Sequence, residues 1–228
     1  LPRIGVGNVK VTSKTRDLVN GVLDSGWISP GPLCARFERE WADLHERRFA
    51  VFVNSGTSAL HIGLAAMKEK YGWRNGATIV VPATTFVASV NTVLHNRLRP
   101  HFMDVDPWYG LDISGPPPPD AVAVMPVHVN GQQADMLRIF RWAESYGLRV
   151  IEDSCECVGA RFEDVMCGNW GDVSCFSTYA CHHVTTGVGG FATTNDPGLA
   201  VLLRSFANHG RDGIYFDAAA PAEQLVAR

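Results

Sequence analysis

The stretch "FAVFVNSGTSALHIGLAAMKEK", residues 49–70, decides the fold. Its first part, 49–55, is a nearly continuous apolar run, which is typical of a β-strand buried on both faces. In the part that follows, 57–70, the apolar residues have the spacing that predicts a helix. Because this strand-helix pattern recurs along the chain, we expect parallel strands joined by crossover helices.

The alternation covers most of the sequence. Further strand-like runs lie at 77–83, 99–106, 120–128, 148–154 and 172–178. Helix-period segments lie at 13–25, 33–47, 84–96 and 134–146. The proline-rich segment 112–120 has no periodicity, so we expect a loop there. The predicted fold class is α/β, with three αβα layers around a mostly parallel central sheet.

The composition and net charge of the chain limit the classes of function that it can have. The chain has 228 residues with 46% hydrophobic content, which suits a soluble globular protein, and its net charge of −3 provides no basic field for nucleic acid or an anionic membrane. Neither a signal peptide nor a membrane span is readable, so we expect a cytoplasmic protein. Residues 1–212 read as one large domain, and 213–228 as the start of a linker or tail.

Five of the six cysteines, 155, 157, 167, 175 and 181, precede the adjacent histidines His182 and His183. A metal site is one interpretation of this cluster. The spacing does not match the paired cysteines of structural zinc sites, however. We therefore expect free thiols that are mostly buried, and no metal.

Three short segments carry candidate site residues. At 54–61, Gly56 permits a tight turn, and Thr57 and Ser58 place hydroxyls where a helix N-terminus favours an anion; simple capping of the helix is the alternative. At 150–154, strand alternation lets only one of Glu152 and Asp153 face a ligand, and Asp153 is the better candidate. Phe86 could stack on a flat ligand, or belong to the core.

Taken together, these segments resemble the large domain of fold-type I pyridoxal-phosphate enzymes, specifically the DegT/DnrJ/EryC1/StrS sugar aminotransferase family. The resemblance runs from about residue 10 to 212. It rests on "GWISPGP", "NSGTSALH", "VPATTFVAS", "PVHVNG", "IEDSCECVGA", "GDVSCFSTY" and "TTGVGGF". It implies that 1–212 is a cofactor-binding large domain, that the enzyme is a homodimer, and that a small C-terminal domain is absent from this chain.

The resemblance also implies roles for individual residues. Thr57, Ser58 and Ser177 would bind the phosphate of pyridoxal or pyridoxamine phosphate, and Phe86 would stack on its ring. Asp153 would pair with the ring nitrogen. Glu156 stands where the family usually has a polar side chain near the ring hydroxyl, so an acid there is a departure. Val188 also departs, because it replaces the acid of a common "GEGG" pattern.

Where aminotransferases of this family have the lysine that binds the cofactor covalently, this chain has His182. The only lysines are Lys10, Lys14, Lys68 and Lys70, all upstream of Asp153. Histidine cannot form that stable bond, but it can carry a proton. The "HHVTTG" run resembles the family's 3-dehydratases of nucleotide-linked 4-keto-6-deoxy sugars.

In that branch His182 would take a proton from the cofactor C4′ carbon while the C3 hydroxyl of the sugar leaves, and L-glutamate would serve as amino donor. Since no cysteine follows "GRD" at 210–212, the chain resembles the type without an iron-sulfur cluster. Two alternatives stay open. One is another reaction on the same fold, such as transamination with a non-covalent cofactor; the other is a catalytically silent binding or assembly subunit.

Overall fold

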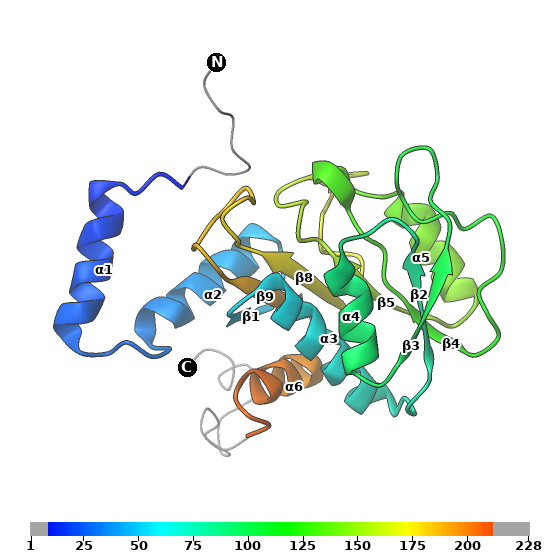
Figure 1. Ribbon diagram of the computed structural model, residues 1–228, viewed down its shortest axis with the longest axis horizontal. Helices are drawn as coiled ribbons and strands as arrows, with labels where there is room; N and C mark the ends of the chain where they lie inside the picture. Colours follow the sequence, from blue (N-terminus) through cyan, green and yellow to red (C-terminus); the bar gives the residue numbers. More distant parts are fainter. Residues whose placement is uncertain (1–8, 212–228) are drawn as a thin grey trace.

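A computed structural model describes residues 9–211 (Figure 1). The predictions for 213–228 lie outside the described residues. Seven strands form the main sheet in the order β1-β9-β8-β5-β4-β2-β3. Their bounds are β1 Phe49–Val53, β2 Thr78–Pro82, β3 Arg99–Met103, β4 Ala121–Val124, β5 Arg149–Asp153, β8 Val173–Ser177 and β9 Gly190–Thr194.

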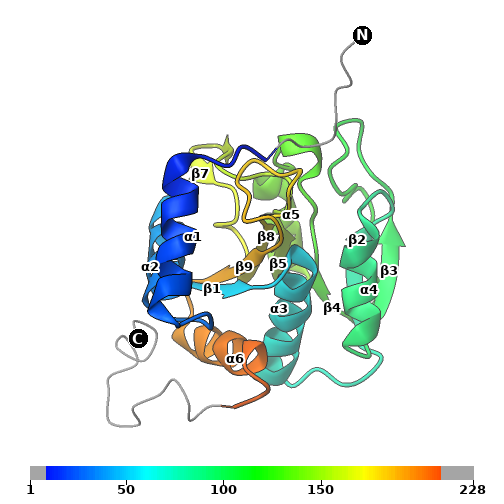
Figure 2. The ribbon, with the colours of Figure 1, turned by 60° about the vertical axis from the view of Figure 1, so that its left-hand side comes forward.

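The helices that belong to this sheet lie on both of its faces (Figure 2). One face packs against α3, α4 and α6 through a core that includes Leu64, Val93 and Leu199. The other face packs against α5 and α2, whose Ile139 and Trp41 belong to two smaller clusters. The helix bounds are α2 Pro32–Leu44, α3 Gly56–Tyr71, α4 Val87–His95, α5 Met136–Ser145 and α6 Pro197–Ala207. The predicted three-layer αβα class is confirmed.

Strand direction is mostly parallel, as expected. β2 pairs in parallel with β3 and β4, β4 with β5, and β5 with β8. β9 is antiparallel to both of its neighbours, β8 and β1, so β1 runs parallel to β8. The carboxyl ends of β1, β2, β4, β5 and β8 therefore meet at one edge of the sheet, which is where an open α/β sheet presents ligand sites.

Every predicted strand run contains an observed strand, and the segment 112–120 joins β3 to β4 without a helix or strand. The sequence analysis did not identify β9, α6 or the two-stranded hairpin of β6, Arg161–Phe162, and β7, Val165–Met166. A single 3-10 turn, η1, spans Val129–Gly131 after β4. None of the helices in 9–211 is long and apolar enough to cross a membrane.

Helix α1, Ser13–Ser25, matches the predicted range 13–25 and stands apart from the sheet (Figure 1). It is capped by the Thr12 hydroxyl, which accepts from the Thr15 N–H, and ends at Gly26 in the left-handed conformation. No α1 residue is buried, and Leu18, Val19 and Leu23 are 50–61% exposed. An apolar helix side is thus open to a partner.

Candidate functional site

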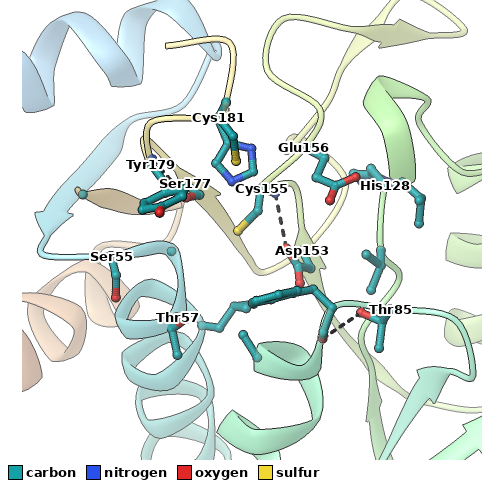
Figure 3. Close-up of a pocket in the computed structure, with 18 of the residues that line it drawn as sticks. Ser55, Thr57, Thr85, His128, Asp153, Cys155, Glu156, Ser177, Tyr179 and Cys181 are labelled. Carbon is teal, nitrogen blue, oxygen red and sulfur yellow. Dashed lines mark hydrogen bonds between the residues drawn. The ribbon is translucent and has the colours of Figure 1, made fainter. Parts of the chain in front are cut away.

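A pocket of about 440 Å³ opens at the edge of the sheet where the parallel strands end (Figure 3). Its wall comes from the segments that follow β1, β2, β4, β5 and β8, and from the two residues before β9. Seven of the eight predicted site residues line it: Gly56, Thr57, Phe86, Asp153, Glu156, Ser177 and His182. The fold thus gathers side chains that lie up to 126 positions apart in the chain.

One end of the pocket is the N-terminus of α3. Ser55 is the N-cap residue, and its hydroxyl accepts the Ser58 N–H at 3.0 Å. The first turn leaves the N–H groups of Gly56 and Thr57 without helical partners, and the helix dipole favours an anion there. The Thr57 side chain is exposed, and the Ser177 hydroxyl comes from the end of β8. This end can hold a phosphate.

A glycine is required at position 56 because neighbouring residues approach its backbone closely, not because of its backbone angles. A Cβ on Gly56 would lie 2.7 Å from the Ser177 Cβ and 2.9 Å from the Cys155 Sγ. The helix start therefore sits directly against β8 and the segment after β5. A larger residue at position 56 would separate the anion-binding turn from Ser177.

Ser58 does not line the pocket, in contrast to its predicted companion Thr57. Its hydroxyl donates to Asn54 Oδ1 at 2.6 Å and accepts from the Ser55 hydroxyl at 3.0 Å. Ser58 therefore stabilises the turn before α3, as the capping interpretation would have it. Ser55 lines the pocket in its place.

Asp153 is a buried carboxylate, 4% exposed, at the pocket end of β5 (Figure 3). Its Oδ2 accepts from the Ser89 hydroxyl at 2.7 Å, and its Oδ1 from the Cys155 N–H at 3.2 Å. Within 9–211 no ion pair involves it. A buried carboxylate without a cation is costly, so this site favours a ligand with a protonated group.

Phe86 is the N-cap residue of α4, one position before the first helical turn in which the sequence placed it. Its side chain is 70% exposed although it lines the pocket. Exposure of this extent excludes the alternative of a core aromatic. An exposed ring at the wall of a pocket is suited to stacking on a flat ligand.

Glu152 faces away from the pocket, as the alternation along β5 predicts. It is fully buried, and its carboxylate accepts from five donors: His128 Nε2 (3.2 Å), the N–H groups of Gly168 (3.1 Å), Trp170 (2.9 Å) and Gly171 (2.6 Å), and the Ser174 hydroxyl (2.9 Å). Burial acts to raise the pKa of Glu152, but these donors and the nearby Arg47 guanidinium keep it below its ordinary value.

His128 lines the pocket, yet both of its ring nitrogens are occupied. Nδ1 accepts the Ala134 N–H at 3.2 Å, so Nε2 carries the proton that Glu152 accepts. Both ring nitrogens are thereby engaged in hydrogen bonds within the protein. His128 therefore contributes a wall to the pocket rather than a proton carrier.

His182 is the pocket imidazole with freedom to exchange a proton. It is half-buried in the loop after β8. Burial lowers its pKa below 6.5 and neighbouring His183 adds to this effect, while Glu156 and Asp153 act in the opposite direction. The Glu156 carboxylate is itself anchored, since its Oε2 accepts the Asn130 N–H at 2.8 Å. At neutral pH the His182 ring is therefore predominantly unprotonated and able to accept a proton.

No lysine lines this pocket. Lys68 donates to Asn75 Oδ1 and to the Asn96 carbonyl, both at 2.7 Å. Lys70 pairs with Asp196 near the start of α6. Since Lys10 and Lys14 are the only others in the chain, no lysine takes the place that His182 occupies.

The cysteines differ in part from expectation. All six are free, and Cys157, Cys167 and Cys175 are buried. Cys181, in contrast to the mostly buried thiols expected, is exposed and lines the pocket with the half-buried Cys155 (Figure 3). Within residues 9–211, no three His, Cys, Asp or Glu side chains are grouped so that they could hold a metal ion.

Several residues that line or support the pocket were not predicted from the sequence, among them Ser55, Thr85, Ser89 and Tyr179. Ser55 carried a usable signal, because a serine before a helical pattern is a preferred N-cap. Ser89 carried none, since a serine inside a helix has no reason to be singled out until the fold brings Asp153 beside it.

A profile of the DegT/DnrJ/EryC1/StrS aminotransferase family matches residues 10–220. The GDP-perosamine synthase of Caulobacter vibrioides is 38% identical over 217 residues, which cover 93% of this chain and 57% of the synthase. The structure of S. venezuelae DesV in complex with a ketimine intermediate is 31% identical with a TM-score of 0.82, and the match covers 93% of this chain and 60% of DesV.

A structure of E. coli GDP-4-keto-6-deoxy-D-mannose-3-dehydratase with bound hydrated PLP is also similar. It is 25% identical with a TM-score of 0.82, and the match covers 87% of this chain and 53% of the dehydratase. The chain thus spans between 53% and 60% of the length of these three relatives.

Proposed function

The chain belongs to the DegT/DnrJ/EryC1/StrS aminotransferase family, and from this premise we propose that it removes the C3 hydroxyl of a nucleotide-linked 4-keto-6-deoxy sugar with pyridoxamine phosphate as cofactor. His182 is the proton carrier of this reaction. The observation that carries the proposal is the presence of His182, and of no lysine, in the wall of the pocket.

The pocket residues fit the cofactor at both of its ends. Thr57, Ser177 and the N-terminus of α3 bind the phosphate, and the close contact at Gly56 keeps these donors together. The buried carboxylate of Asp153, which forms no ion pair within residues 9–211, would hold the ring nitrogen in its protonated form. Phe86 covers one face of the ring, and Glu156 is the nearest candidate for a contact with the ring hydroxyl.

When bound, pyridoxamine phosphate would supply a primary amine for the C4 ketone and an electron-withdrawing ring that makes the C4′ proton acidic, so that the electrons of that C–H bond can expel the C3 hydroxyl. His182 removes a proton from the cofactor C4′ carbon, for which its lowered pKa is suited. The imidazolium so formed then gives this proton to the departing C3 hydroxyl, which leaves as water. A lysine at this position would bind the cofactor covalently, whereas His182 forms no lasting covalent bond with it. The cofactor can therefore remain in its free amine form.

Similarity to the E. coli dehydratase supports this reaction. Amino transfer to a nucleotide sugar is the second candidate, and similarity at 38% identity to a GDP-perosamine synthase favours it. The absence of a lysine from the pocket argues against the usual covalent form of that reaction. A catalytically silent binding or assembly subunit is the remaining alternative, and failure of the protein to bind the cofactor at any added concentration would favour it.

The substrate is a nucleotide sugar and L-glutamate is the amino donor that regenerates the cofactor. We also propose a cytoplasmic homodimer. The exposed apolar side of α1, with Leu18, Val19 and Leu23, supports a second copy of the chain as the cover of this surface. Sedimentation of the wild-type protein and a Leu23→Glu variant tests the dimer, which the added charge should weaken.

The test of the reaction is incubation with pyridoxamine phosphate, L-glutamate and a panel of GDP-, CDP- and dTDP-linked 4-keto-6-deoxyhexoses. We expect a product that lacks the C3 oxygen, identified by mass. A His182→Gln protein should bind the cofactor but form no product, because the amide cannot carry the proton. An aminated sugar that keeps its C3 hydroxyl would establish the second candidate instead.

A further inference from the structure

Ser89 is a fully buried hydroxyl on α4 that connects two walls of the pocket. Its Oγ lies 2.7 Å from Asp153 Oδ2, 2.7 Å from the Thr85 hydroxyl and 3.1 Å from the Phe86 carbonyl. Thr85, Phe86 and Asp153 all line the pocket, whereas Ser89 does not. One side chain behind the wall thus contacts three residues within it.

The direction of these hydrogen bonds follows from the acceptors. A serine has one proton to donate, and a carboxylate is a stronger acceptor than a carbonyl. Ser89 therefore donates to Asp153, and its oxygen is left to accept from the Thr85 hydroxyl. The Phe86 carbonyl still receives the Ser89 backbone N–H at 3.1 Å. The result is a directed chain of hydroxyls from Thr85 through Ser89 to Asp153.

We infer that Ser89 is a positioning residue for the cofactor ring: it fixes the Asp153 carboxylate and the start of α4, which carries Phe86, in one arrangement. This inference rests on the proposed cofactor. The carboxylate meets the edge of the ring at its nitrogen, and Phe86 meets a ring face. Ser89 contacts both of these elements, so it sets the angle between the two contacts that orient the ring.

A purely structural role is the competing explanation, because serine in a helix often bonds back to a preceding carbonyl. Thr92 offers the matched comparison. It is also fully buried on α4, and its Oγ1 donates to the Ser89 carbonyl at 3.1 Å, which is the backward bond that a purely structural role would give Ser89 toward the Phe86 carbonyl. Thr92 does not line the pocket, and no hydrogen bond within the described chain joins its hydroxyl to Asp153.

The test compares Ser89→Ala with Thr92→Val, each of which removes one buried hydroxyl from α4. Two ligands are titrated into each protein by calorimetry: pyridoxamine phosphate, and its analogue in which a CH group replaces the ring nitrogen. We expect Ser89→Ala to weaken binding of pyridoxamine phosphate about tenfold, the effect of one lost charge-assisted hydrogen bond. It should change the affinity for the analogue by less than about twofold, because the analogue has no ring nitrogen for Asp153 to meet.

Thr92→Val should leave both affinities unchanged. The absorption band of bound pyridoxamine phosphate should shift in Ser89→Ala and stay in place in Thr92→Val, since it reports protonation of the ring. Equal weakening of both ligands in Ser89→Ala would mean a structural role, and unchanged binding would mean no role; either result overturns this inference alone. If the wild-type protein binds no pyridoxamine phosphate, both the proposed function and the inference about Ser89 are overturned.

Discussion

Substitution by alanine should affect the stability of the protein differently at three glycines, and Gly56 is the one on which the site depends. The structure sorts them by what an added Cβ would meet. At Gly115, in the loop between β3 and β4, nothing lies within 4 Å. At Gly63, inside α3, the Cβ would lie 3.1 Å from the Ile151 Cδ1 and 3.2 Å from the Cys175 Sγ. At Gly56 it would lie 2.7 Å from the Ser177 Cβ.

The magnitudes follow from these distances. Gly115→Ala restricts only the unfolded chain and should stabilise the fold by about 0.4–1 kcal/mol. Gly63→Ala gains about 1 kcal/mol of helix propensity and loses a comparable amount to tight contacts, so it should stay within about 1 kcal/mol of wild type. Gly56→Ala overlaps the β8 end itself and should cost about 1–3 kcal/mol.

Urea unfolding measures the stability of each variant, and fluorescence titration with pyridoxamine phosphate measures the site. The overlap at position 56 pushes the start of α3 away from Ser177. Gly56→Ala should therefore weaken the binding of pyridoxamine phosphate by the folded protein at least about tenfold. Gly115→Ala and Gly63→Ala should bind as wild type does. A Gly56→Ala protein with wild-type stability and affinity would refute the close approach of α3 to β8.

Three further predictions concern charge. Glu152→Gln turns one of the two buried acceptor oxygens into an N–H₂ group that faces donors, and it removes the charge 3.9 Å from the Arg47 guanidinium, so it should cost about 3–5 kcal/mol in urea unfolding. Glu163→Gln, on the exposed β6–β7 turn, should cost less than about 0.5 kcal/mol. In NMR titrations Glu156→Gln should lower the pKa of His182 and His183→Gln should raise it; shifts of the same sign would contradict the arrangement of these charges. Burial lowers the pKa of His45, His61 and His182, so the unfolded chain takes up these protons first, and the free energy of unfolding should fall as pH drops through about 6.5; a flat profile between pH 5 and 7 would contradict this.

The fold was largely predictable because its signal is local. Strands buried on both faces are mostly apolar, and the run at 77–83 shows this without any knowledge of its neighbours. The opposite directions of Glu152 and Asp153 follow from the two-residue period of a strand. Strand β9 was not predicted because Thr193 and Thr194 give its sequence a polar character. Their hydroxyls donate to the Ser174 and Asp172 carbonyls, partners that only the folded sheet supplies.

The site was less predictable because it depends on where helix α3 begins, to within one residue. The sequence offered three hydroxyls around the start of α3, but which of them caps the helix and which faces the pocket depends on the exact first residue of that helix. With Ser55 as N-cap, Thr57 faces the pocket and Ser58 turns to Asn54. Ser89 could not be placed at all, because Asp153, which accepts its hydrogen bond, comes from strand β5, distant in the sequence.

Transfer of oxygen from the sugar to water is the central claim, and an isotope label tests it most directly. The protein is given pyridoxamine phosphate in slight excess over a nucleotide-linked 4-keto-6-deoxyhexose that carries an oxygen isotope at C3, and sugar and water are analysed after one turnover. We predict that the label leaves the sugar and appears in water with wild-type protein, and stays in the sugar with His182→Gln. A wild-type product that gains nitrogen and keeps the label would contradict the account.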